Sequence, residues 1–262
     1  KVKTNLAVFP HENILGHIAL INDVNHTYTK PYFSSRLEYK LRRATFVLNL
    51  PLSLNYATTN NREEKQELTK VFLNPKLSFK YEFNNMFKIN ASGQYEQNID
   101  NFENYYDNPV LSDYQSLFTM IAPMSVSDLT RANVRFTFNQ PFYAINSSLS
   151  YTYQHRNSDI IYKYDIDENG ASYLQMIESP NTSDYHVINL NVKKFISVIK
   201  TTIGLKANLL HNTRHNILNG SLVENKNISA SIMPNMMVTI KHWAHFNYSF
   251  NFNNIQTFSE DV

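Results

Sequence analysis

The residues best suited to bind a ligand lie at positions 165–170, which read Asp-Ile-Asp-Glu-Asn-Gly. Oxygen-bearing side chains at alternate positions followed by glycine resemble the opening of a calcium-binding loop, with Asp165, Asp167 and Asn169 as ligands. That loop needs a glutamate at its twelfth position, where this chain has Met176. The same residues also fit a polar hairpin tip that is closed by Asn-Gly. We expect the hairpin tip, with the calcium site as the alternative.

Three tyrosines are the candidate ligand-binding residues: Tyr105, Tyr106 and Tyr114. They lie in a predicted connection, residues 96–130, that is too long for a plain hairpin loop. Aromatic rings in such a loop can stack on a sugar or an aromatic ligand, although ordinary loop packing uses the same residues. Within the connection, residues 112–121 have apolar side chains at helical spacing after a serine, which predicts either a short helix or an irregular loop.

No arrangement of residues predicts an enzyme. The chain has no cysteine, which excludes thiolate nucleophiles, thiolate metal sites and disulfides. His211 and His215 are four positions apart, but the residues between them are typical of a loop and include no glutamate of the zinc-protease kind. The sequence also has no phosphate-binding glycine loop, nucleotide fingerprint or Ser-His-Asp ordering. We therefore expect no catalytic residues and no cofactor.

Charge and hydropathy exclude two further classes. The net charge is only +2, and lysine and arginine are scattered, so we expect no nucleic-acid partner. No segment approaches the roughly eighteen consecutive apolar residues of a membrane helix. Residues 1–10 lack the apolar core and cleavage site of a secretory signal. Crossing a membrane as strands remains open, because only every second residue of such a strand has to be apolar.

The elements that position these residues are predicted to be long strands with one apolar and one polar face. Around the break at Gln140-Pro141, apolar residues such as Phe136 and Leu149 alternate with polar ones such as Arg135 and Ser150. Successive side chains of a strand point to opposite faces, so this alternation predicts a hairpin with two unlike walls. Similar runs predict about eleven strands, at 14–21, 33–41, 45–56, 71–83, 87–95, 131–138, 143–155, 186–196, 201–209, 228–232 and 238–252.

The connections between these strands alternate in length. Short turns are predicted at 42–43, 84–85, 139–142, 196–200 and 234–235, and long polar loops at 22–32, 57–70, 96–130, 156–184 and 211–226. Outer-membrane barrels have short turns at one end and long loops at the other. We therefore expect an all-β, antiparallel up-and-down meander of about eleven long strands that forms part of a transmembrane β-barrel. Lys194 and His242 depart from the pattern, because they fall in the apolar phase.

The alternative is a soluble or surface-attached β-sandwich that binds a glycan or a protein. Such a fold also alternates polar and apolar residues, but its apolar faces would pack on each other instead of facing lipid. The predicted strands are long for a sandwich, and the five glycines are few for its many tight corners. A hydrolase with its site on a barrel rim is a third hypothesis, for which no catalytic set can be assembled.

Several stretches resemble one family: residues 108–117, 139–143, 148–151 and 200–205. They read Asn-Pro-Val-Leu-Ser-Asp-Tyr-Gln-Ser-Leu, Asn-Gln-Pro-Phe-Tyr, Ser-Leu-Ser-Tyr and Lys-Thr-Thr-Ile-Gly-Leu. They are similar to the barrel of TonB-dependent receptors from Bacteroidota, above all those with a carboxypeptidase-regulatory-like domain. The similarity covers most of the chain but consists of barrel patterns, so it assigns no functional residue.

The resemblance implies the later part of a barrel of about twenty-two strands that is closed by a plug. Residues 1–262 are then expected to be one incomplete segment of an outer-membrane barrel, without the plug domain and without the terminal aromatic residue of the family. The implied function is TonB-energised uptake of a nutrient such as a glycan or a metal chelate. The implied partners are outer-membrane lipid, the TonB system through the plug, and in some members a surface lipoprotein.

Overall fold

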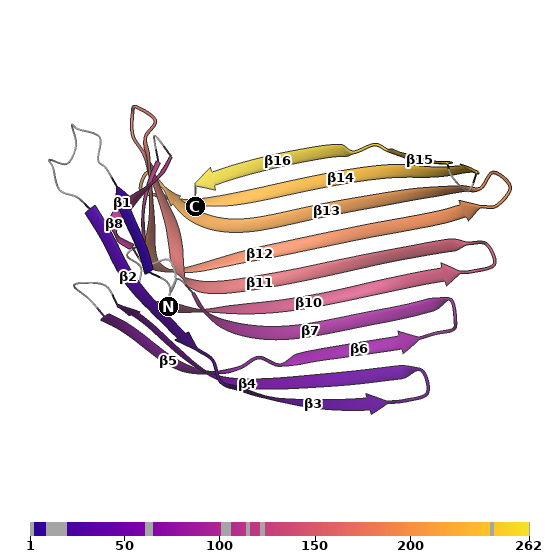
Figure 1. Ribbon diagram of the computed structural model, residues 1–262, viewed down its shortest axis with the longest axis horizontal. Helices are drawn as coiled ribbons and strands as arrows, with labels where there is room; N and C mark the ends of the chain where they lie inside the picture. The colour runs from indigo at the N-terminus through magenta and orange to yellow at the C-terminus, as the bar shows by residue number, and fades with distance from the viewer. Residues whose placement is uncertain are drawn as a thin grey trace.

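A computed structural model describes residues 3–8, 20–60, 65–100, 106–113, 116–120, 124–241 and 244–261. Within these ranges the chain forms one sheet of sixteen strands and no α-helix (Figure 1). None of the described segments is a helix with the length and apolar content needed to cross a membrane. The strands are β1 (Lys3–Val8), β2 (Leu20–Thr29), β3 (Tyr32–Lys40), β4 (Ala44–Asn60), β5 (Lys65–Leu73), β6 (Lys76–Glu82), β7 (Phe87–Asp100), β8 (Tyr106–Asp113), β9 (Ser116–Met120), β10 (Ser125–Gln140), β11 (Ile145–Ile166), β12 (Ser172–Ile196), β13 (Thr201–Leu218), β14 (Ser221–Lys241), β15 (Ala244–Ser249) and β16 (Phe252–Asp261).

The sheet is an antiparallel meander, as predicted. Its main path runs β1-β2-β4-β6-β7-β10-β11-β12-β13-β14-β15. Strands that are neighbours in the sheet are therefore also consecutive along the chain, apart from the five strands that this path omits. The path ends at β1 and at β15, and no pairing between these edges is present among the described residues, so the sheet is open. Figure 1 shows the strands side by side in a broad sheet, with hairpin turns along one end and a strong bend toward the other.

The path contains eleven strands, and the larger total has two sources. Three lines of the meander are each split in two, because β2 and β3, β5 and β6, and β15 and β16 pair with successive parts of one neighbour. Two of these breaks contain Pro31 and Pro75, whose missing N–H interrupts a ladder. The second source is the hairpin of β8 and β9, which lies between β7 and β10 in sequence.

Four of the five predicted short turns are confirmed, and the fifth is wrong. Connections of a few residues join β3 to β4, β6 to β7, β10 to β11 and β12 to β13. The predicted turn at 234–235 lies inside β14, which continues to Lys241. The carbonyl of Pro234 accepts a hydrogen bond of 3.1 Å from the N–H of Phe250. The nitrogen and the carbonyl of one strand residue point to the same side, so the missing N–H of Pro234 also faces Phe250, which lies in the break between β15 and β16. A proline is tolerated in a strand where no partner needs its N–H.

The long polar loops are mostly wrong, because the strands continue through them. β11 and β12 remain paired as far as Ile166 and Ser172, and β13 and β14 meet at the turn 219–220. Residues 22–29 belong to β2, and 57–60 and 65–70 belong to β4 and β5. The suggested helix within 112–121 is also wrong, because the described residues there lie in β8 and β9. Alternation of hydropathy disappears where both faces are polar, although the backbone ladder continues.

The sheet has very little buried core. Ala57, Phe72 and Ile99 form one small cluster, and Ile160 and Met176 form another. Most large apolar side chains of the broad sheet are instead exposed, among them Leu77, Phe136, Leu149 and Ile232. An apolar surface of this size without a covering layer is unusual for a water-soluble monomer. It is the feature that any functional account has to explain.

Candidate functional site

The pairing register sorts the side chains of the broad sheet into two walls. Leu149 on β11 is paired with Phe136 on β10 and with Leu190 on β12, so these three side chains share a face. The next residue, Ser150, is paired with Arg135 and Asn189 and therefore lies on the opposite face. We call the face of Leu149 the apolar wall and the face of Ser150 the polar wall. This assignment agrees with the two faces predicted from sequence.

The apolar wall exposes large side chains over a band that has a definite height. Leu77, Phe136, Leu149 and Ile232 are 53, 50, 44 and 51 % exposed. On β14 the band extends from Ile240 to Ile228, which is about 40 Å measured along the strand. For a strand tilted by about 45°, this length spans a layer about 28 Å thick. The apolar core of a bilayer is about 30 Å thick, and the apolar band of an outer-membrane barrel is about 25 Å tall.

One end of this band is marked by tyrosine and histidine side chains. Tyr153, His186 and His211 are neighbours in the register of β11, β12 and β13. The ring centroids of Tyr153 and His186 are 5.0 Å apart, and those of His186 and His211 are 5.8 Å apart. The hydroxyl of Tyr151 also hydrogen-bonds Nδ1 of His186 at 2.9 Å. Rings with a polar tip are enriched where a membrane meets water.

Charged residues follow immediately beyond that row. Asp184 lies two residues from His186, on the same face of β12. Its Oδ1 accepts a hydrogen bond from the Tyr153 hydroxyl at 2.9 Å and lies 2.9 Å from Nδ1 of His155. Burial alone would raise the pKa of Asp184, but the hydrogen bonds from His155 and Tyr153 outweigh it and hold the pKa below its ordinary value. The wall therefore changes from apolar to ionic within a few residues.

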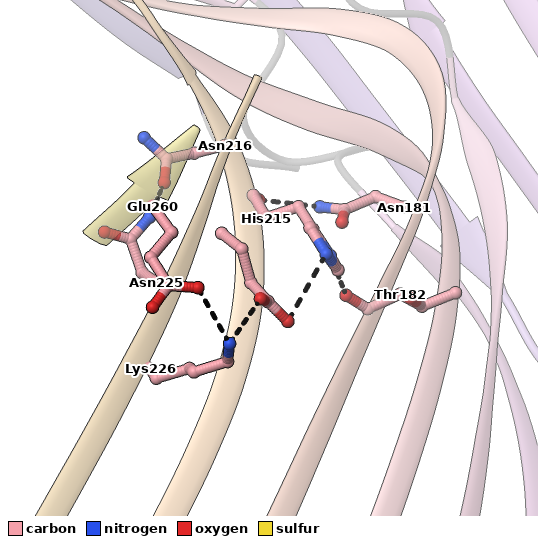
Figure 2. Close-up of polar contacts among 8 residues, drawn as sticks. Asn181, Thr182, His215, Asn216, Asn225, Lys226 and Glu260 are labelled. Atoms are coloured by element: carbon pink, nitrogen blue, oxygen red, sulfur yellow. Dashed lines mark hydrogen bonds and ion pairs between the residues drawn. The ribbon is translucent and has the colours of Figure 1, made fainter. Parts of the chain in front are cut away.

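Polar and ionic contacts also join β13, β14 and β16 beyond the apolar band (Figure 2). Lys226 Nζ lies 2.7 Å from Glu224 Oε2 and 3.3 Å from Glu260 Oε2, and Glu224 Oε1 lies 3.9 Å from Nε2 of His215. Hydrogen bonding to Lys226 lowers the pKa of Glu224, although partial desolvation opposes the shift. His215 Nδ1 lies 3.3 Å from the Thr182 carbonyl. The pair of Lys226 and Glu224 lies within β14, and the other contacts cross between neighbouring strands, as polar pairs on a sheet commonly do.

The polar wall is hollowed across β7, β10, β11, β12 and β13. There Arg156 on β11 donates to Asp100 on β7 at 2.6 Å and to the Ser127 hydroxyl at 3.4 Å. The hollow has a volume of about 650 Å³, which falls within the usual range for ligand sites. It is lined by Asn98, Asp100, Ser127, Leu129, Gln154, Arg156, Ser183, Tyr185 and Asn212. An arginine-carboxylate pair among amides and hydroxyls can hydrogen-bond a polar solute but does not form a nucleophile-base pair.

Sequence reasoning missed this hollow. Asp100 and Arg156 were placed by prediction in the long connections 96–130 and 156–184, whereas both lie on strands. The available signal was their phase, because Asn98 and Asp100 continue the polar face of β7, and Gln154 and Arg156 continue that of β11. Phase alone could not show that the two strands stay in register with β10 between them.

The calcium candidate forms a hairpin tip in the structure. Oδ1 of Asp167 accepts the backbone N–H groups of Asn169 at 2.9 Å and Ala171 at 2.8 Å. Gly170 has a φ of 80°, as the turn between β11 and β12 requires. Asp165 is ion-paired with Lys163 at 2.6 Å. Among the described residues, no three side chains of the types His, Asp and Glu gather as a metal site would require.

The remaining predicted residues are distributed as follows. Tyr105, Tyr114 and His242 lie outside the described residues, and Tyr106 is at the start of β8, paired with Met120 of β9. His211 and His215, predicted in a loop, both lie on β13. Lys194 is exposed on the apolar wall, close to the turn that follows β12.

Comparison of the chain with family models, with curated proteins and with solved structures found no match.

Proposed function

We propose that the chain is a segment of an outer-membrane β-barrel and that it contributes the wall of a transport channel. The observation that carries this proposal is the apolar wall, an exposed band whose height fits a bilayer and which ends at a row of Tyr153, His186 and His211. A lipid-facing band between ring-rich and ionic borders is the pattern of outer-membrane strands. The polar wall then lines a wet interior.

A β-sandwich explains the same observation less well. In a sandwich the apolar face packs against a second sheet, and the two inner faces together form the core. Among the described residues all strands belong to one sheet, and side chains such as Leu77 and Phe136 are about half exposed. Burying them would require a second layer that the described residues do not provide. Lipid supplies that layer in the barrel proposal.

The resemblance to TonB-dependent receptors supplies the finer part of the proposal. A receptor of this kind binds a nutrient, such as a glycan or a metal chelate, at its outer side, and a plug gates the channel under energy from the TonB system. In this proposal the segment provides wall and outer strands, and the plug and energy coupling come from other parts of the receptor. Its partners are outer-membrane lipid and, in some receptors, a surface lipoprotein.

The test is fractionation of cells that express the chain with an outer-membrane targeting signal. We expect it in the Sarkosyl-insoluble outer-membrane fraction, with a gel mobility that changes on heating, as intact barrel sheets show. Recovery as a monomer that is soluble without detergent would contradict the proposal and favour the sandwich. Hydrolysis of chromogenic esters that one loop substitution abolishes would instead support a rim hydrolase.

A further inference from the structure

Positive charge is concentrated on the polar wall to a degree that the net charge of +2 does not suggest. From β6 to β14, counting described residues in unshifted register, this wall has nine lysines and arginines against three acidic residues. The acidic residues are Glu82, Glu96 and Asp100. A wall with an excess of one sign raises the local concentration of ions of the other sign.

Four of these cations form a regular frame. Lys76 on β6 is paired with Gln94 on β7, which is paired with Arg131 on β10. Four residues further along, Lys80 and Arg135 occupy equivalent places on either side of Asn90. The corners are therefore about 13 Å apart along the strands and about 10 Å apart across them. We call Lys76, Lys80, Arg131 and Arg135 the cation frame.

Most of the frame has no counter-ion within the described part of the chain. Lys80 Nζ lies 2.9 Å from Glu82, which is shared with Lys88 at 3.1 Å. Lys76, Arg131 and Arg135 form no ion pair with any described residue. Arg131 Nη2 donates to Gln154 Oε1 at 3.2 Å, but its Nε is buried and has no acceptor among the described residues. Arg135 is exposed, so its guanidinium is accessible to a bound oxyanion.

Neutral polar side chains lie between the two pairs of cations. Ser78, Ser92 and Asn133 form the register row in the middle of the frame. Nδ2 of Asn133 donates to the Thr152 hydroxyl at 2.7 Å and to the Tyr151 carbonyl at 3.2 Å, so the serine hydroxyls are the donors of this row that a ligand can use. On one side of the frame, Lys76 and Gln94 also line a hollow of about 450 Å³ together with Lys30. Long lysine and arginine side chains at the corners can reach toward one ligand over these hydroxyl and amide groups.

We propose that the cation frame binds solutes with two or more oxyanion groups, whether phosphate, sulfate or carboxylate. If these solutes are transported, the inference rests on the proposed function, because the frame meets them only when the polar wall lines the channel. Guanidinium groups bind such oxyanions through paired, charge-assisted hydrogen bonds. Rings of lysine and arginine are also what makes a pore select anions. The frame thus assigns the channel a preference for anionic solutes over neutral ones.

The test is calorimetric titration of the full chain in detergent micelles with sodium tripolyphosphate, at low and at high salt. We expect binding that weakens steeply with salt, and an affinity that is about tenfold or more lower in R131Q/R135Q. The matched control is K194Q/K226Q, which removes two positive charges from the opposite face and is expected to leave the affinity unchanged. R131K/R135K, which keeps the charge but loses the paired hydrogen bonds, is expected to have an affinity between those of wild type and R131Q/R135Q, and Arg135→Gln alone serves if the double variant does not fold.

Two results would overturn the frame: wild-type chain that does not bind tripolyphosphate, or equal loss of affinity in R131Q/R135Q and K194Q/K226Q. Flotation of the same preparations with lipid vesicles separates this inference from the proposed function. Chain that floats but does not bind tripolyphosphate contradicts the cation frame alone. Chain that binds tripolyphosphate but does not float contradicts the barrel and limits the frame to an anion site on an exposed sheet.

Discussion

Tyr153 on β11 and His186 on β12 are register partners whose ring centroids lie 5.0 Å apart, at the level where the apolar wall ends. Two residues beyond His186, the next side chain on the same face is the carboxylate of Asp184, which accepts a hydrogen bond from the Tyr153 hydroxyl. A single tyrosine therefore packs its ring against His186, where the apolar wall ends, and directs its hydroxyl to the first charged residue beyond it. This is the position that a ring with a polar tip prefers at a membrane surface.

Removing that anchor should destabilise the sheet. Tyr153→Phe keeps the ring but loses the hydrogen bond to Asp184, and we expect a loss of about 1 kcal/mol. Tyr153→Ala also loses the ring contact with His186, and we expect a loss of about 2–4 kcal/mol. Urea unfolding in lipid vesicles, followed by tyrosine or tryptophan fluorescence, measures both values. Equal stability of wild type and Tyr153→Ala would exclude an anchoring role.

Charge should be tolerated on one wall and not on the other. Leu149→Arg places a cation in the middle of the apolar wall, and we expect a loss of about 2–4 kcal/mol in vesicles. Ser150→Arg adds the same side chain one residue away, on the polar wall, and is expected to cost less than about 1 kcal/mol. The measurement is the difference between the two unfolding free energies. A larger cost for Ser150→Arg would reverse the assignment of the walls.

Acid should weaken the ionic border through Asp184. Its pKa lies below the ordinary value of 3.8, so its contribution is complete above that pH and is lost as pH falls through the lowered pKa. We expect the stability difference between wild type and Asp184→Asn to be constant from about pH 7 to about pH 5 and to shrink below about pH 4. Chemical unfolding across this range gives the difference. A difference that grows on acidification would contradict the sign.

The hairpin tip should depend on Asp167 and not on calcium. Asp167→Ala loses the acceptor of two backbone N–H groups, and we expect a local loss of about 1–2 kcal/mol that Asp167→Asn largely avoids. Hydrogen exchange of the Asn169 and Ala171 amides reports this directly. Millimolar calcium is expected to leave the thermal midpoint unchanged. A calcium-dependent midpoint that Asp167→Asn abolishes would restore the metal site.

The sequence predicts the walls of the sheet well because hydropathy alternates wherever one face is apolar. The alternation predicts that Phe136 and Leu149 lie on the apolar wall of one hairpin, and the register pairs them. The ends of the strands were not predictable in the same way. From Gln154 to Asp159 both faces of β11 are polar, so the alternation that would reveal the strand is interrupted there although β11 continues to Ile166.

The functional surfaces depend on relationships across strands, which a single sequence does not contain. Arg131 and Arg135 are visible as two cations on the polar phase of one strand, but their partners Lys76 and Lys80 lie on β6, with β7 between. The pair of Asp100 and Arg156 spans 56 residues of sequence. Such contacts depend on the register of several hairpins at once. One wrongly predicted turn, such as that at 234–235 inside β14, gives the wrong strand pairing for the residues that follow it.

The most direct test of the account is the environment of paired spin labels in lipid vesicles. Labels at Leu77, Leu149 and Ile232 probe the apolar wall, and labels at Ser78, Ser150 and Ser231, each one residue away, probe the polar wall. We predict high accessibility to oxygen for the first set and to a water-soluble nickel chelate for the second. Labels at Leu77, Leu149 and Ile232 that are shielded from both reagents would show a protein layer over the apolar wall and would contradict the account.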